Sequence, residues 1–213
     1  MLLGARQFFE RRGAPTPPLP YDAEVEYLES TGTQWIDTGI SMEFPMACDM
    51  TFSIDTNYGT TTSIPVFGIR VSTNAKYAFW VSKTDGKLAL NYGRYDSGFA
   101  GGDVRSFANV YNVGAKMYCN DALICDGGSP ILENDSRTLY MFTLNDFGSA
   151  SIRGSRFKIA RATISNGSGD QVDFIPVRVG SGASAVGYMY DRISGMLFGN
   201  SGTGAFIIGP DKS

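Results

Sequence analysis

The stretch Lys76-Tyr-Ala-Phe-Trp-Val-Ser-Lys-Thr-Asp-Gly-Lys-Leu-Ala-Leu-Asn-Tyr92 carries the pattern that decides the fold. Its two halves, Lys76–Ser82 and 87–92, alternate large apolar residues with small or polar ones. This two-residue period is typical of a half-buried β-strand. Asp85-Gly86 lies between the halves, and Asp-Gly between alternating runs is the strongest short-range signal of a β-hairpin. The stretch therefore predicts two antiparallel strands.

The two faces of this hairpin differ in character. A two-residue loop at Asp85-Gly86 predicts that Trp80 pairs with Asn91. One face then carries the side chains of a core, namely Tyr77, Phe79, Val81, Leu88, Leu90 and Tyr92. The other face carries Trp80 and Asn91 among small residues, with Tyr95 next along the chain.

Strand patterns of the same kind recur from residue 21 onward. Further candidate strands lie at 24–29, 50–54, 113–118, 122–125, 138–143, 157–164, 172–178, 188–190 and 205–208. No stretch after residue 20 keeps the 3.6-residue period of an amphipathic helix over ten residues. About a dozen short strands with turns between them predict an all-β sandwich or jelly roll of two antiparallel sheets in one domain.

Composition limits both the class of protein and its chemistry. The chain has 213 residues, 13% aromatic residues and 26 glycines but only 18% charged residues, which suits one strand-rich domain. It contains no histidine, so Ser-His-Asp and Cys-His catalysis and histidine-ligated zinc are excluded. A formal net charge of -3 and a pI near 5.0 argue against nucleic-acid binding.

The first 20 residues form a separate segment. Residues 14–20 contain four of the nine prolines, which is typical of an extended spacer. Residues 1–13 are basic and apolar, but charges interrupt them, so they lack the unbroken apolar run of a secretory signal. No apolar run reaches the roughly 20 residues that span a bilayer. We therefore expect an arm at 1–20 and a sandwich domain at 21–213.

This arm is a candidate docking peptide. It would anchor the chain by adding a helical turn or a strand to a partner, and the alternative is a frayed tail. The residues suited to docking are Leu2, Leu3, Phe8, Phe9, Arg11 and Arg12.

Trp80, Asn91 and Tyr95 are the candidate ligand-binding residues of the domain. A flat aromatic ring beside an amide and small residues can hold a sugar, because the ring stacks and the amide bonds a hydroxyl. The alternative is that Trp80 lies beneath a loop or in a contact between subunits. The pattern therefore nominates this face for glycan binding.

Carboxylates are the remaining route to catalysis. Alternation along 24–29 places Glu24 and Glu26 on one face, with Cα atoms about 7 Å apart. Retaining glycosidases place their carboxyl groups about 5–5.5 Å apart, so a hydrolase is an alternative. The run is also the first strand after the arm, where negative charge on an edge deters aggregation. We expect no catalytic residue.

Three cysteines, Cys48, Cys119 and Cys125, form no CxxC pair. A two-residue turn at Asn120-Asp121 pairs Cys119 with Ala122 and leaves Cys125 out of register, so free thiols are expected. We expect no cofactor, with calcium as an alternative, because the turn aspartates lack D-x-D-x-D spacing. Those aspartates are Asp85, Asp96, Asp103, Asp121 and Asp126.

Two stretches near the ends of the domain resemble a known family. Residues 26–40, with the run Gln-Trp-Ile-Asp-Thr-Gly at 34–39, resemble the opening of concanavalin A-like (laminin-G-like) domains of gut bacteria and their phages. The C-terminal signature of those domains is similar to three segments here, 173–178, Val186–Asp191 and 197–206. The segments 139–145 and 156–160 resemble their last core strands. The resemblance covers about 21–210 and implies a jelly-roll sandwich.

For function the resemblance implies adhesion more than catalysis, since the family includes lectins, glucanases and many non-catalytic modules. The glucanases carry an E-x-D-x-E-like strand in mid-chain, which is absent here. An adhesive sandwich behind a basic, Pro-rich arm, beginning at Met1 with no secretion signal, resembles a bacteriophage virion surface protein. We expect a head fibre, decoration or tail component, anchored to other virion proteins and binding host or mucosal glycans. A homo-oligomer is expected, and a purely structural virion protein is the alternative.

Overall fold

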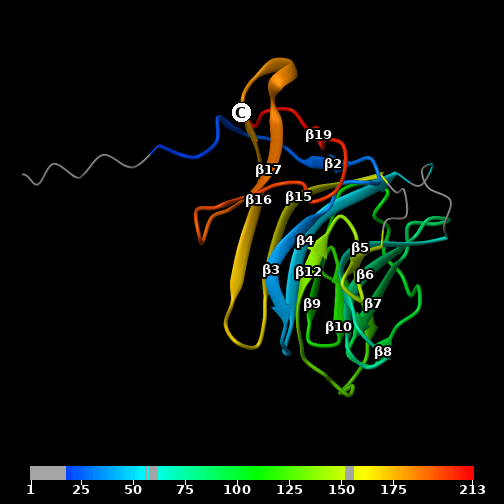
Figure 1. Cartoon of the computed structure of the whole chain (residues 1–213). Helices are drawn as coiled ribbons and strands as arrows, with labels where there is room; N and C mark the ends of the chain where they lie inside the picture. The colour runs from blue at the N-terminus through cyan, green and yellow to red at the C-terminus, as the bar shows by residue number, and fades with distance from the viewer. Residues whose placement is uncertain (1–17, 56, 58–61, 152–155) are drawn as a thin grey trace, which may run out of the picture.

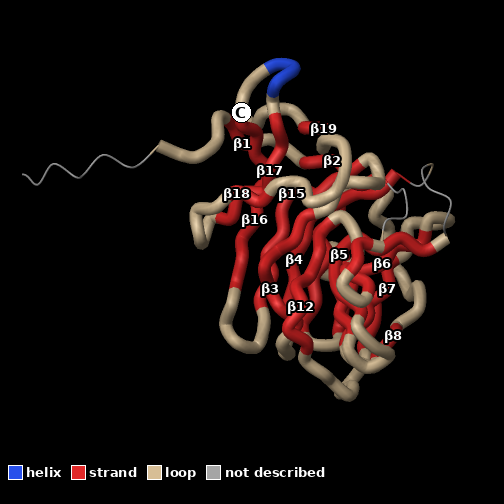
Figure 2. Tube along the Cα trace, viewed as in Figure 1, coloured by secondary structure: helices blue, strands red, loops and turns tan. Residues whose placement is uncertain are grey.

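The computed structural model describes residues 18–55, 57, 62–151 and 156–213. In this part of the chain the strands form two sheets (Figures 1 and 2). The first sheet contains β1 (Ala23–Glu24), β2 (Leu28–Ser30), β4 (Ala47–Asp55), β9 (Ala108–Val113), β10 (Lys116–Cys119), β11 (Ala122–Asp126), β15 (Arg156–Ser165), β16 (Gln171–Val179), β17 (Val186–Asp191), β18 (Leu197–Phe198) and β19 (Ile207–Ile208). The second contains β3 (Ile36–Met42), β5 (Ser63–Arg70), β6 (Lys76–Ser82), β7 (Leu88–Tyr92), β8 (Tyr95–Asp96), β12 (Asp135–Met141), β13 (Asn145–Asp146) and β14 (Ser149–Ala150). A 3-10 turn, η1 (Gly182–Ser184), precedes β17.

Antiparallel pairing dominates both sheets. The first sheet has the order β11-β10-β9-β4-β15-β16-β17-β18, and one edge of β15 is shared by β2 and β16. In the second sheet β12 lies between β3 and β5, and β6, β7 and β8 follow on the other side of β5. The exception is the two-residue β13, which pairs with β5 in parallel. The predicted all-β, two-sheet architecture is therefore confirmed.

The β6–β7 hairpin forms, but in a different register from the predicted one. Trp80 pairs with Ala89 rather than with Asn91, because the loop comprises four residues, 83–86. Relative to the prediction, the pairing slips by two residues. Such a slip leaves each side chain on the face it already had, since the side-chain period of a strand is two. The predicted core face is accordingly buried throughout.

Aromatic rings fill much of the space between the sheets. The rings of Tyr77 and Phe79 on β6 lie edge to face with Phe67 on β5, at centroid distances of 5.5 and 5.7 Å. Phe52 on β4 and Phe174 on β16 are fully buried in the same core. Edge-to-face contacts are the preferred geometry of aromatic pairs. The apolar side chains that alternate along β6 and β7 thus form one side of the core.

The buried amide of Asn112 joins the two sheets. Its Oδ1 accepts hydrogen bonds from the backbone amide of Cys48, at 2.8 Å, and from the hydroxyl of Tyr77, at 2.6 Å. Its Nδ2 donates to the carbonyl oxygens of Met46, at 3.0 Å, and Gly114, at 2.9 Å. Cys48 belongs to the first sheet and Tyr77 to the second. One side chain therefore satisfies polar groups from both layers.

Residues near the two ends of the domain interlock. Thr33 Oγ1 and Gln34 Nε2 both donate to the carbonyl oxygen of Thr203, at 2.8 and 3.1 Å. The side chain of Asn200 accepts a hydrogen bond from the backbone amide of Trp35, at 3.1 Å. Beside these contacts β2 pairs with β19. Residues in the two stretches that resemble the known family therefore hold the ends of the domain together.

Asp191 organises the turn between β17 and β18. Its carboxylate accepts hydrogen bonds from the backbone amides of Asp173, at 2.8 Å, Ile193, at 3.1 Å, and Ser194, at 3.0 Å. Burial by itself raises the pKa of this carboxyl group, but the bonds from Ser194, Asp173 and Ile193 outweigh burial and hold the pKa below its ordinary 3.8. The ionised form of Asp191 is therefore favoured by the fold.

The run 24–29 is not the single strand that its alternation predicts. It divides into β1 and β2, joined by a bridge at Val25 and a bend at Glu26. β2 lies between β15 and β19, so it is not a sheet edge. The segment 113–118 is also broken, by the turn at Gly114 between β9 and β10. In both runs a short bend or turn changes the direction of the chain, although apolar and polar residues keep alternating along the sequence.

Replacing Asn112 with alanine should lower the free energy of unfolding by on the order of 3 kcal/mol, because the Tyr77 hydroxyl and the Cys48 amide would remain buried without an acceptor. Tyr77→Phe removes one donor only and should cost about 1 kcal/mol. Urea unfolding followed by circular dichroism measures both losses. Equal, small losses in the two variants would contradict a linking role for Asn112.

Asp191→Asn should lower Tm most at neutral pH. The folded pKa of Asp191 lies below its unfolded value, so the stabilisation is fully present above the unfolded pKa and is lost as the pH falls through the folded pKa. The difference in Tm between the variant and the original chain should therefore shrink from pH 7 to pH 3. Differential scanning calorimetry at both values tests this, and a pH-independent difference would contradict it.

Candidate functional site

Trp80 and Asn91 lie together on the outer face of the second sheet. The indole Nε1 of Trp80 donates a hydrogen bond to Oδ1 of Asn91 across β6 and β7, at 2.8 Å. Asn91 is buried and Trp80 is half-buried. The bond fixes the orientation of the indole ring before any ligand arrives. The structure thus brings together two of the three side chains nominated from the sequence.

A hollow of about 320 Å³ opens beside this pair. It exists because Trp80 faces the small Ala89 across the strand pair, and because Gly98 adds no side chain. Phe99, which is 40% exposed, provides a second aromatic wall. The remaining lining residues are Ser63, Arg70, Lys76, Asn91 and Asp96. Phe99 was not predicted as a site residue, because it follows β8 in a segment with no regular alternation.

The charged groups around this hollow compensate one another. Arg70 makes two hydrogen bonds to the carboxylate of Asp146, at 2.9 and 2.6 Å. Lys76 Nζ lies 3.3 Å from Asp96 Oδ2. The hollow therefore offers hydrogen-bonding groups of both kinds without a strong net charge. That combination suits a neutral polyhydroxy ligand.

Tyr95 does not belong to this site, and its assignment to the Trp80 face is a correction. Asp96 pairs with Asn91, and Tyr95 pairs with Tyr92. Tyr92 is a core residue and Tyr95 packs against the same core, so Tyr95 lies on the inner side of the sheet. Burial is the main reason that the pKa of Tyr95 rises, to about 12. The turn between β7 and β8 sets this register, and the register decides that Asp96 rather than Tyr95 shares a face with Asn91.

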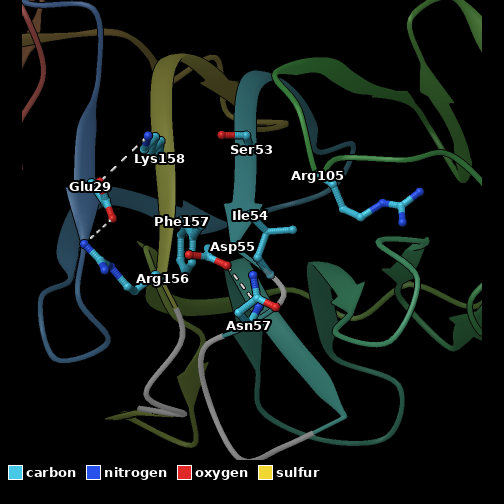
Figure 3. Close-up of a pocket in the computed structure, with 9 residues that line it drawn as sticks. All are labelled: Glu29, Ser53, Ile54, Asp55, Asn57, Arg105, Arg156, Phe157 and Lys158. Carbon is cyan, nitrogen blue, oxygen red and sulfur yellow. Dashed lines mark hydrogen bonds and ion pairs between the residues drawn. The ribbon is translucent and has the colours of Figure 1, made fainter.

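A second hollow, of about 510 Å³, lies at the ends of β2, β4 and β15 (Figure 3). Oε1 of Glu29 lies 2.8 Å from the guanidinium of Arg156, and its Oε2 lies 4.0 Å from Nζ of Lys158. Asp55 accepts a hydrogen bond from the backbone amide of Asn57, at 3.0 Å. The carboxylate of Glu29 is thus engaged by two cations at one end of this hollow.

The glutamates of the run 24–29 are separated in the fold. Glu24 Oε2 lies 3.7 Å from Lys212 Nζ, and Glu29 belongs to the second hollow. Glu26 is exposed at the bend after Val25. The continuous strand that would place Glu24 and Glu26 on one face therefore does not form.

The cysteines are free thiols in the structure. Cys48 and Cys119 are buried and Cys125 is half-buried. The turn at Asn120-Asp121 pairs Cys119 with Ala122 as predicted. Burial raises the pKa of the Cys48 thiol, which makes it an inert core group. Among the described residues, no three side chains of the metal-binding types cluster in a way that could hold an ion.

The proposed docking residues of the arm, Leu2, Leu3, Phe8, Phe9, Arg11 and Arg12, lie outside the described residues. In the part of the chain that the structure describes, no helix has the length and apolar character to cross a membrane.

No protein-family model, curated protein or solved structure matches this chain. The sheets themselves identify the protein as a β-sandwich, compatible with a jelly roll.

Proposed function

We propose that this chain is a non-catalytic carbohydrate-binding protein whose binding site is the hollow around Trp80 and Asn91. The observation that carries the proposal is the 2.8 Å hydrogen bond between these two side chains on an outer sheet face. A half-buried aromatic ring that is already oriented loses little conformational freedom when a sugar stacks on it. The ligand-binding surface is thus built before binding.

The polar groups of the hollow complete this site. Within the described residues, Nδ2 of Asn91 has no hydrogen-bond acceptor, while Oδ1 is used by Trp80. Nδ2 would therefore donate to a sugar hydroxyl. The carboxylate of Asp96 would accept from another hydroxyl, and Lys76 beside it would donate. Directional polar bonds around a stacked ring would give the site its specificity.

A bacteriophage particle is the setting we propose for this activity, with the arm at 1–20 as the anchor and the sandwich exposed to host or mucosal glycans. Support comes from the resemblance at both ends of the domain and from the composition of the arm. A single hollow would bind one sugar weakly. Display of many copies would turn that weak affinity into retention on a surface.

Trp80→Ala should weaken binding at least tenfold on a glycan array, a loss of about 1.4 kcal/mol. The control is Trp35→Phe, because Trp35 lies just before β3, stacks on Tyr140 of β12 with ring centroids 4.2 Å apart, and does not line the hollow. Retained binding in the Trp80 variant would remove this residue from the site. A blank array from the folded original chain would favour the purely structural virion protein.

Deleting residues 1–20 should abolish incorporation into phage particles, because the anchor is lost while the strands that begin at Ala23 remain. The measurement is immunodetection of the chain in gradient-purified particles from infected cells that express each form. Circular dichroism of the shortened chain confirms that the sandwich still folds. Full incorporation of that folded form would contradict the anchoring role.

A further inference from the structure

A row of outward-facing side chains crosses the first sheet at right angles to its strands. The register places Tyr118 beside Tyr111, Tyr111 beside Asp49, Asp49 beside Thr163, and Thr163 beside Asp173. We call these five residues the cross-strand row. It runs over β10, β9, β4, β15 and β16, a length of about 19 Å at 4.7–4.9 Å per strand. The residues that alternate with them along the strands face the core.

The two tyrosines form an aromatic wall at one end of this row. Their rings are stacked, with centroids 4.9 Å apart and planes inclined by 9°. Because Tyr118 covers one face of Tyr111, the opposite face of Tyr111 is turned toward Asp49. The Tyr111 hydroxyl also donates to Asp121 Oδ1, at 3.3 Å, which limits rotation of the ring. Tyr111 is therefore a fixed platform with one open face.

That face borders a hollow of about 140 Å³. The carboxylate of Asp49 is held there by a hydrogen bond from Asn109 Nδ2, at 2.5 Å. Thr163, Ser165 and Gln171 add two hydroxyl groups and an amide on the far side. All of these side chains are half-buried or exposed, so a ligand can reach them. An aromatic face thus meets carboxylate, hydroxyl and amide groups in one small depression.

We propose that this depression is a second saccharide-binding site, specific for a neutral sugar unit that stacks on Tyr111 and bonds to Asp49 and Gln171. The carboxylates of Asp49 and Asp121 would repel an acidic sugar, whereas the charge of Asp173 is compensated by Arg161 and Arg192. A second copy of the chain fits less well, since a stable protein interface needs about 1,000 Å² with an apolar centre. This site is independent of Trp80, because it belongs to the other sheet.

Two sites on opposite sheets would make one domain bivalent. A single protein would then link two glycan chains, and residence on a polysaccharide would exceed what either site gives alone.

The test is a ¹⁵N NMR titration of the full chain with oligosaccharides from mannan, dextran, xylan and galactan, repeated with polygalacturonate fragments. At least one neutral probe should shift the amides of Asp49, Tyr111, Thr163 and Gln171, and the shifts should persist in Trp80→Ala. Tyr111→Ala should weaken this binding at least tenfold. Asp49→Asn provides a second variant that preserves shape, and Val113→Ala is the control on the same strand, outside the row.

Absence of shifts at these amides with all four neutral probes would overturn the proposal, whatever happens at Trp80. Equal or stronger shifts with polygalacturonate would overturn the neutral-sugar specificity. Sedimentation velocity tests whether a second copy of the chain covers the cross-strand row instead. A concentration-dependent dimer that Tyr111→Ala abolishes would assign the row to a contact between copies and would refute the saccharide site.

Discussion

The amide of Asn112 imposes the constraint on which the two-sheet arrangement depends. It lies inside an apolar core, where an unpaired amide would cost about as much as several apolar contacts contribute. It is tolerated because β4 and its approach provide Cys48 and Met46, while β6 provides Tyr77. These partners come from different sheets, so the sheets can satisfy them only in one relative position. Polar bonds in a core can specify a unique packing that apolar contacts alone would leave open.

Both candidate binding surfaces follow from that packing. Phe79 and Val81 face inward, so Trp80 between them on β6 must face outward. In the first sheet, the burial of Val110 on β9 turns Tyr111 outward in the same way. These outward-facing, half-buried aromatic rings are therefore held by the core beneath them. Each surface inherits the rigidity of a sheet, which loops alone would not provide.

The sequence was most informative where alternation was regular. The faces of Trp80 and Asn91 were predicted correctly even though the hairpin register was wrong by two residues, because facing depends only on parity. The strands β3 and β5 were missed. In β5, Pro65 and Gly68 interrupt the pattern; a Cβ atom at Gly68 would lie 2.1 Å from the carbonyl oxygen of Tyr77. Glycine there reflects tertiary crowding, which no local pattern reveals.

The candidate sites were predictable to different degrees for related reasons. Trp80 and Asn91 could be assigned to one face from a single hairpin, but Phe99 and Tyr95 depend on how the chain turns after β7. The cross-strand row joins five strands drawn from residues 49 to 173, so it exists only once the sheet order is known. The bridge at Val25 and the bend at Glu26 likewise interrupt the strand that was expected to hold Glu24 and Glu26 on one face. Long-range order, rather than residue type, was the missing information.

The interlocked ends of the domain have a consequence for how this protein folds during synthesis. Leu28 on β2 pairs with Ile208 on β19, and the Lys212 amide donates to the carbonyl oxygen of Glu24. The early strand β2 therefore keeps one unpaired edge until the ribosome has made about 180 further residues. Pairings of such high sequence separation close slowly and leave intermediates prone to association. The edge of β2 that pairs with β19 is thus the place where incompletely folded copies of the chain should associate.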